Sequence, residues 1–130
     1  KEIKGNVANR MQAALWHEAA SLVADGVASV ADVDAAIAMG PALRWAIMGP
    51  LLTLHLNGGA GGLRYWFDNI SKLKPGDPIG STLMSAELLD LLAKGVEEEA
   101  AGRSVADLVI ERDEKLIAIF RVLGLAKPSD

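Results

Sequence analysis

The sequence predicts an all-α fold, a compact bundle of about five to six helices. Apolar residues recur at helical spacing, and no segment alternates between apolar and polar residues as a strand would. Hydrophobic residues make up 51% of the 130 residues but aromatic residues only 5%, so the core must be built from Ala, Leu, Val and Ile. A chain of this length forms one domain, which we expect to span residues 1–126 with 127–130 as a frayed tail.

The first helix is predicted between Val7 and about Asp25, and Gly26 offers a stop. Four apolar residues recur within it at helical spacing: Met11, Leu15, Leu22 and Val23. They give the helix one face that can pack against the rest of the bundle.

The second helix is predicted to follow Ser29, a favoured N-cap residue. Asp32 stands three residues later, in place of the usual Glu or Gln of a capping box. Gly40-Pro41 is a strong break and ends this helix.

A short segment from Ala42 to Met48 precedes a second break, Gly49-Pro50. Pro50 suits the first turn of a new helix, because its missing N–H would have no partner there. That third helix, Leu51 to about Leu56, is almost wholly apolar, so we expect it in the middle of the bundle.

The rest of the chain predicts three more helices. The fourth begins near Gly61 and is followed by the clearest loop, residues 74–78. It carries Leu63, Tyr65, Trp66, Phe67 and Ile70. The fifth spans about 85–101 and the last about 105–123. Two features delimit these helices, a terminator at Gly102 and a second capping pattern at Ser104 and Asp107.

Composition and charge exclude several classes of function. The net charge of −4 argues against a nucleic-acid or anionic-membrane surface. The absence of cysteine excludes a disulfide framework and a thiolate metal site. No run of about 18 apolar residues and no signal-peptide pattern is present, so we expect a cytoplasmic protein.

The run Gly5-Asn6-Val7-Ala8-Asn9-Arg10-Met11-Gln12 is the most informative about function. A glycine and a small-residue turn lead into a helix that carries Asn9 and Arg10 in its first turns. The Asn9 amide can donate and accept hydrogen bonds, so it is a candidate ligand contact at the mouth of an apolar domain. Because Asn is also a favoured capping residue, an ordinary cap is the alternative.

Other polar residues form no recognisable catalytic set. His17-Glu18 begins like the zinc-protease signature, but Ser21 stands where the second histidine belongs. With two histidines and no cysteine, we expect no metal site. The pair Asp32 and Asp34 complements a helix dipole, and the run Glu97-Glu98-Glu99 is typical of a solvated helix face.

The glycine-rich segment 58–62 invites comparison with a nucleotide-binding loop. It fits neither the dinucleotide fingerprint nor the P-loop, and no strand precedes it. The simpler interpretation is a flexible connection between helices.

Two cation–aromatic groups are candidate substrate contacts, Arg44-Trp45 and Arg64 with the three aromatic residues after it. They can line an anionic or quaternary-ammonium site through ion pairs and cation–π contacts. Packing is the alternative, with arginine stems covering the rings. His55 lies on an apolar helix, where a core residue with a satisfied ring nitrogen is the alternative to a ligand contact.

Three segments together resemble a known family: KEIKGNVANRMQ at 1–12, GVASVADVD at 26–34 and RWAIMGPLLTLHLN at 44–57. They are similar to the C-terminal helical domain of the 3-hydroxyacyl-CoA dehydrogenase superfamily. The nearest branch contains lambda-crystallin (L-gulonate 3-dehydrogenase) and L-carnitine dehydrogenase. The likeness is clear over residues 1–70 and looser beyond. One departure is Asn6, where the family commonly has an aromatic residue.

The resemblance implies a bundle like the C-terminal domain of 6-phosphogluconate dehydrogenase, paired as a homodimer. It also implies an N-terminal Rossmann domain, absent from this chain, that binds NAD. In such enzymes the helical domain closes the cleft and contributes an asparagine, which corresponds to Asn9 and hydrogen-bonds the substrate oxygen or the catalytic histidine. The chain alone is then expected neither to bind NAD tightly nor to oxidise a hydroxy acid.

The expected substrate is a 3-hydroxyacyl-CoA or a small 3-hydroxy acid, with Arg44, Trp45, His55 and Arg64 as contacts. The homodimer is expected to pair through the helices around Pro50 and Leu88. The competing hypothesis is a non-enzymatic interaction module whose grooves hold a partner helix. An autonomous hydrolase is disfavoured because the sequence offers no nucleophile set.

Overall fold

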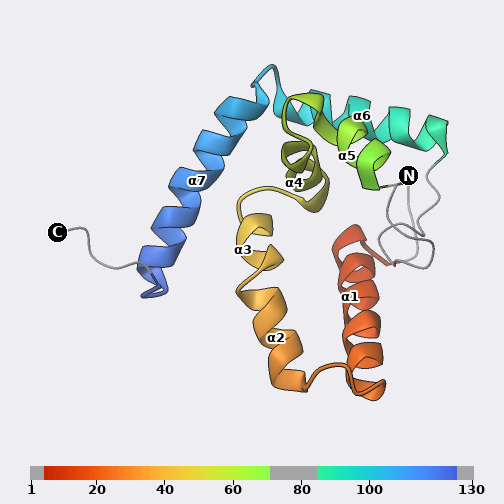
Figure 1. Cartoon of the computed structure of the whole chain (residues 1–130), viewed down its shortest axis with the longest axis vertical. Coiled ribbons are helices and arrows are strands. Elements are labelled where there is room, and N and C mark those ends of the chain that lie inside the picture. Colours follow the sequence, from red (N-terminus) through yellow and green to blue (C-terminus); the bar gives the residue numbers. More distant parts are fainter. Residues whose placement is uncertain (1–4, 71–84, 126–130) are drawn as a thin grey trace. The chain divides into compact units, whose positions relative to one another are not determined.

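The computed structural model describes residues 5–70 and 85–125, apart from the side chain of Ile70. Helices make up this part of the chain and no strand occurs in it, so the predicted all-α fold is confirmed (Figure 1). The elements in order are α1 (Val7–Ala24), α2 (Val30–Ala38), α3 (Pro41–Trp45), α4 (Pro50–Asn57), the 3-10 helix η1 (Gly59–Gly61), α5 (Gly62–Ile70), α6 (Ala86–Ala100) and α7 (Val105–Val122). The predicted loop at 74–78 and the predicted tail lie outside the described residues.

The chain divides into two compact units, Lys1–Ala42 and Leu43–Asp130. In the first unit, α1 and α2 are joined by a short turn and contact each other. Gly26 ends α1 with a φ of 69°, a left-handed conformation that glycine adopts without steric cost. Neither helix has a fully buried residue, so the hairpin exposes apolar surface on both helices.

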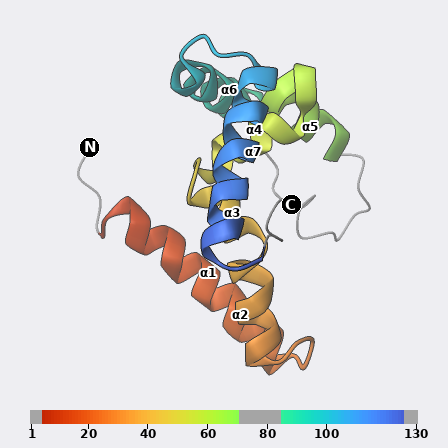
Figure 2. The ribbon, with the colours of Figure 1, turned by 90° about the vertical axis from the view of Figure 1, so that its left-hand side faces the viewer.

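The second unit has its core around α4. Pro50 occupies the first turn of this helix, as predicted, and Leu52, Thr53 and Leu56 are buried. The helix contacts α5, α6 and α7, which confirms its expected central place. The buried cluster comprises Met48, Leu52, Leu56, Leu63, Val96, Ala100 and Leu108. Figure 2 shows α4, α5 and α6 gathered at one end of this unit, with α7 leading away from them.

The predicted capping boxes at the starts of α2 and α7 are both present. The backbone N–H of Asp32 donates to the Ser29 hydroxyl at 3.2 Å, and the Ser29 N–H donates to the Asp32 carboxylate at 3.2 Å. The hydroxyl and backbone N–H of Ser29 lower the pKa of Asp32 by hydrogen bonding, and Ser104 lowers the pKa of Asp107 in the same way. These carboxylates therefore fix helix starts, as the sequence indicated.

The turn between α6 and α7 has two consecutive left-handed residues. Ala101 is the C-cap of α6, with a φ of 52°, and the predicted terminator Gly102 follows it with a φ of 79°. The Arg103 side chain then donates to the Ala100 carbonyl at 2.9 Å and pairs with Glu111 at 2.7 Å. Lys115 and then Arg103 lower the pKa of Glu111, and Arg103 links the last carbonyls of α6 to this residue of α7.

Among the described helices, none alone is long and apolar enough to cross a membrane. One bent pair, Val30–Trp45 with Pro50–Asn57, reaches that length and composition when taken together.

Candidate functional site

The first turn of α1 places Asn9 at the surface. Asn6 has an extended backbone and is the N-cap, and its side-chain oxygen accepts a hydrogen bond from the Asn9 N–H at 2.8 Å. The Asn9 carboxamide is exposed and makes no hydrogen bond within the described part of the chain. The sequence offered an ordinary helix cap as the alternative role for Asn9. In the structure Asn6 is the cap, so the Asn9 side chain keeps its full capacity to donate and accept hydrogen bonds.

The face of α1 that carries Asn9 also carries an exposed indole. Side chains at i, i+4 and i+7 share one face of a helix, so Ala13 and Trp16 follow Asn9 along it. Trp16 is 65% exposed, and the helical rise places it about 10 Å from Asn9 along the axis. Sequence reasoning missed Trp16, although this spacing was visible.

The α1–α2 hairpin has an open apolar hollow of about 370 Å³. Its lining consists of Ala19, Ala20, Val23, Ala24, Val30, Val33 and Asp34. A single carboxylate among alanine and valine side chains offers no acid–base pair. Asn9 does not line the hollow, so the surface around Asn9 and this hollow are separate features of the first unit.

Arg44 and Trp45 lie at the end of α3. The Arg44 side chain is half-buried and has no ion pair among the described residues, whereas Trp45 is 41% exposed. An unpaired guanidinium can bind a carboxylate, and an exposed indole face can attract a cation. Arg44 and Trp45 can therefore still make the ion pair and the cation–π contact that the sequence indicated.

Arg64 is engaged elsewhere in the second unit. It forms an ion pair with Asp90, which joins α5 to α6, and both side chains are more than half exposed. Such a pair contributes little to stability because water screens it, but it orients the guanidinium toward α6. Using Arg64 as a substrate contact would require this pair to open.

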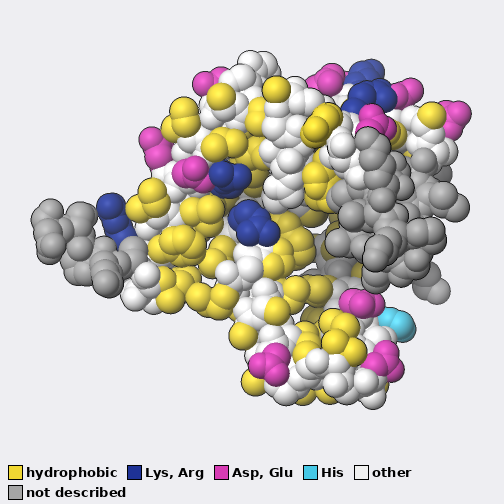
Figure 3. All heavy atoms as spheres, viewed as in Figure 1, with side chains coloured by type: hydrophobic (Ala, Val, Ile, Leu, Met, Phe, Trp, Pro, Cys, Tyr) yellow, Lys and Arg dark blue, Asp and Glu magenta, His cyan; other side chains and the backbone are white. Residues whose placement is uncertain are grey.

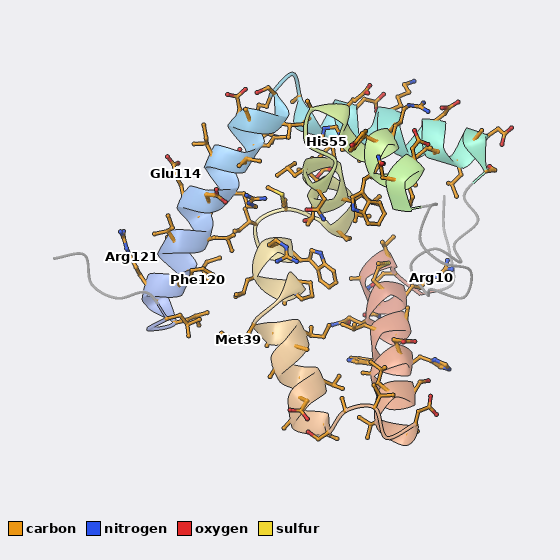
Figure 4. The ribbon with its side chains drawn as sticks, viewed as in Figure 1. Arg10, Met39, His55, Glu114, Phe120 and Arg121 are labelled. Carbon is orange, nitrogen blue, oxygen red and sulfur yellow. The ribbon has the colours of Figure 1, made fainter. Side chains whose placement is uncertain are left out.

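His55 connects α4 to the start of α5 (Figure 4). Its Nδ1 accepts a hydrogen bond from the Leu63 N–H at 3.4 Å, and the ring is half-buried. A Cβ at Gly62 would lie 2.8 Å from the ring, so glycine is needed there for space as well as for its φ of 60°. One ring nitrogen of His55 therefore has a hydrogen-bond partner within the chain. This agrees with the alternative in which His55 is a core residue with a satisfied ring nitrogen.

The glycine-rich segment is a packed turn, not the flexible connection that the sequence suggested. Residues 59–61 form η1, and a Cβ at Gly58 would lie 1.8 Å from the Gly62 carbonyl oxygen. The Leu63 N–H that begins α5 is already bonded to His55. With no strand before it and these groups engaged, the described segment does not fit a dinucleotide phosphate.

The structure does not join the predicted site residues directly. Within residues 5–70 and 85–125, no hydrogen bond, ion pair or ring contact links any two of Asn9, Arg44, Trp45, His55 and Arg64. Asn9 belongs to the first unit and the other four to the second. No group of three or more His, Cys, Asp or Glu residues in this part is arranged to hold a metal. The assignment of the five predicted site residues to a substrate site remains a prediction.

Comparisons with known proteins agree over most of the chain. A family model described as "3-hydroxyacyl-CoA dehydrogenase, C-terminal domain" matches residues 5–98. L-carnitine dehydrogenase of Streptomyces griseus is 46% identical over 126 residues, which cover 95% of this chain and 38% of that protein. L-carnitine dehydrogenase of Bacillus cereus is 43% identical over 124 residues, which cover 94% of this chain and 38% of that protein. The L-carnitine dehydrogenase of Pseudomonas aeruginosa is 37% identical over 129 residues, which cover 98% of this chain and 40% of that protein.

The chain spans about two fifths of the length of the curated relatives it matches. No solved structure matches it.

Proposed function

Because this chain belongs to the 3-hydroxyacyl-CoA dehydrogenase C-terminal domain family, we propose that it completes the substrate cleft of an NAD-dependent dehydrogenase. Its described residues do not fit a dinucleotide, so NAD is held by a separate N-terminal domain, a partner consistent with the family's description as a C-terminal domain. The single observation that supports this role most is the exposed Asn9 carboxamide, freed from capping by Asn6.

Asn9 acts in this proposal as a positioning group at the substrate. Its amide donates to the substrate oxygen, or to the imidazole of the partner domain that handles the hydroxyl proton. Either hydrogen bond holds the hydroxyl carbon in reacting geometry, which lowers the barrier by orientation. The capped first turn of α1 supports this, because the Asn6 side chain accepts a hydrogen bond from the backbone N–H of Asn9.

The proposed substrate is L-carnitine, a small 3-hydroxy acid with a carboxylate and a quaternary ammonium group. The names of the relatives support this choice. So does the chemistry at the end of α3, where the unpaired Arg44 suits a carboxylate and the exposed Trp45 suits a cation. A 3-hydroxyacyl-CoA is the alternative substrate, and it would need further cations for its phosphates.

The partners in this proposal are the NAD-binding domain and a second copy of the chain. The apolar side chains exposed on both helices of the α1–α2 hairpin support association, since neither helix buries a residue fully. The isolated chain is expected to self-associate without any cofactor.

A hybrid enzyme tests the function. The chain is joined to the N-terminal portion of the Streptomyces griseus relative, and NADH formation is measured with L-carnitine, gulonate and 3-hydroxybutyryl-CoA. We expect activity with L-carnitine and none from the chain alone. Activity with the CoA ester only would contradict the substrate, and no activity from a folded, NAD-binding hybrid would contradict the dehydrogenase role.

A further inference from the structure

Trp16 presents a bare indole on the surface of the α1–α2 hairpin. It is 65% exposed, and no hydrogen bond or ring contact involves it in the described part of the chain. Tryptophan is highly buried on average in folded proteins, and a buried indole N–H usually finds a hydrogen-bond partner. The ring of Trp16 is therefore available to a molecule from outside the chain.

Trp16 lies on the same side of α1 as Asn9. Asn9, Ala13, Trp16 and Ala20 stand at i, i+4, i+7 and i+11, and we call them the Asn9 face. All four residues are exposed. Ala13 separates the carboxamide from the indole with only a methyl group. Because long side chains on a helix lean toward its N-terminus, we expect the indole to lean over Ala13 toward Asn9.

The spacing along the Asn9 face fits a substrate that carries a hydroxyl group and a cation close together. The helical rise separates Asn9 and Trp16 by about 10 Å along the axis, and the lean of the indole shortens the gap between the two side chains. In L-carnitine three covalent bonds lead from the hydroxyl oxygen to the ammonium nitrogen. A hydrogen bond at Asn9, these three bonds and a cation–π contact within about 6 Å of the ring centre can together bridge the distance.

The charge of the hairpin favours a cation on the Trp16 side. Residues 11–42 contain four carboxylates and no Lys or Arg. Over the lower part of the hairpin, Figure 3 shows acidic side chains and a histidine but no Lys or Arg. Arg10 lies at the other end, near the start of α1 (Figure 4). A zwitterion along the Asn9 face would therefore point its ammonium group toward Trp16 and its carboxylate toward the start of α1.

Trp45 is another exposed indole that suits a cation. It belongs to the second unit, whereas Asn9 belongs to the first. Trp16 and Asn9 lie on one continuous helix, which sets the spacing between them. Trp16 is therefore the exposed indole whose place relative to Asn9 is defined.

We propose that the indole face of Trp16 binds the quaternary ammonium group of the substrate while Asn9 binds its hydroxyl oxygen. Tryptophan is the best aromatic partner for such a cation, and the contact discriminates against a neutral group of the same shape. Trp16 is then the residue that separates L-carnitine from a 3-hydroxy acid without a cation. The inference rests on the proposed function and adds the residue that recognises the cationic end of the substrate.

A neutral analogue of L-carnitine, with carbon in place of the ammonium nitrogen, tests the contact in the hybrid enzyme. Trp16→Leu is expected to lower the preference for L-carnitine, measured as the ratio of the two kcat/KM values, about five- to thirtyfold. Trp16→Phe should lower it less. Met11→Ala is the matched control, an exposed apolar residue on the opposite side of α1, and it should leave the preference unchanged.

Two results would overturn the proposal. One is an equal loss of kcat/KM with both substrates in Trp16→Leu, which would mean that the ring packs against another protein surface. The other is a preference that falls in Trp45→Leu but not in Trp16→Leu.

Fluorinated tryptophans at position 16 test the nature of the contact without changing the shape of the side chain. Each added fluorine withdraws electron density from the ring face and weakens its attraction for a cation. The logarithm of kcat/KM for L-carnitine should fall steadily along the series, and that for the neutral analogue should stay constant. A constant value for L-carnitine would overturn the cation–π contact even if Trp16→Leu impairs the enzyme.

The neighbouring alanines test whether the substrate lies between Asn9 and Trp16. Ala13→Leu fills the space between the two side chains and should lower kcat/KM for both substrates at least about tenfold. Ala14→Leu adds the same bulk at an equally exposed position on another side of α1 and should change it little. Equal effects of the two substitutions would contradict a substrate on the Asn9 face.

A binding measurement separates this inference from the proposed function. Fluorine NMR of the hybrid with one monofluorinated tryptophan at position 16 should show a shift with L-carnitine and none with the neutral analogue. A hybrid that oxidises L-carnitine without this shift would overturn the inference and leave the function standing. A folded, NAD-binding hybrid that shows the shift but does not oxidise L-carnitine would contradict the function and leave the cation contact standing.

Discussion

The side-chain oxygen of Asn6 accepts a hydrogen bond from the backbone N–H of Asn9, 2.8 Å away. This contact divides two tasks between two asparagines that stand three residues apart. Asn6 satisfies a helix donor that would otherwise lack a partner, and Asn9 is left with an exposed carboxamide. The two residues should therefore respond differently to the same substitution.

The first prediction concerns stability. Asn6→Ala removes the cap of α1 and should lower the free energy of unfolding by about 1 kcal/mol. Asn9→Ala removes no bond and should change it by less than about 0.5 kcal/mol. Urea denaturation followed by circular dichroism measures both, and a larger loss from Asn9→Ala would show that its side chain has a structural role.

The second prediction concerns catalysis in the hybrid enzyme. Asn9→Ala should lower turnover about ten- to a thousandfold, or about 1.4–4 kcal/mol of transition-state stabilisation. Asn57→Ala is the matched control, an exposed asparagine at the end of α4 that should leave turnover unchanged. Steady-state kinetics with L-carnitine gives both values, and unchanged turnover in the Asn9 variant would remove Asn9 from the site.

The third prediction concerns the turn between α4 and α5. Gly58→Ala would place a methyl group 1.8 Å from the Gly62 carbonyl oxygen, so the backbone must shift. We expect a loss of at least about 2 kcal/mol in the free energy of unfolding. The neighbouring Asn57→Ala, at an exposed position, should cost less than about 0.5 kcal/mol. A stable Gly58 variant with unchanged near-ultraviolet circular dichroism would contradict the tight packing.

The fourth prediction concerns pH. Hydrogen bonds from Ser29 and Ser104 lower the pKa of Asp32 and Asp107 in the folded chain. The folded state therefore binds fewer protons than the unfolded state at acidic pH. The stability that these carboxylates add is fully present above the ordinary aspartate pKa of 3.8, and it is lost as the pH falls through their lower folded values.

Chemical denaturation between pH 7 and pH 2 tests this dependence. The double variant Ser29→Ala with Ser104→Ala should be less stable at pH 7 by about 2 kcal/mol, since each cap contributes about 1 kcal/mol. It should also lose less stability on acidification than the parent chain. If the free energy of unfolding fell equally with pH in the two proteins, the capping carboxylates would not be the cause of the acid dependence.

Much of the fold could be predicted because its signals are local. The capping boxes at Ser29 and Ser104 each involve residues three positions apart, and Pro50 begins α4 by the geometry of its own ring. Such signals are complete within one helical turn, so the sequence contains all that determines them. The predicted starts of α2 and α7 are therefore correct.

The missed features depend on residues that are distant in sequence. The segment 59–61 forms a regular turn, next to which the His55 ring packs against Gly62, whereas composition alone suggested a flexible connection. Arg64 is held by Asp90, 26 residues away, which no spacing rule indicated. The helical face shared by Asn9 and Trp16 was visible in the sequence, but the exposure of the indole was not.

The bond between His55 and Leu63 also decides where the imidazole carries its proton. A neutral ring that accepts at Nδ1 must hold its hydrogen on Nε2. The structure therefore selects one tautomer, and while this bond lasts the ring can act toward any other molecule only as a hydrogen-bond donor. A carboxylate or carbonyl oxygen can accept a hydrogen bond from Nε2 of His55, whereas an ammonium or amide N–H has no free ring nitrogen lone pair to donate to.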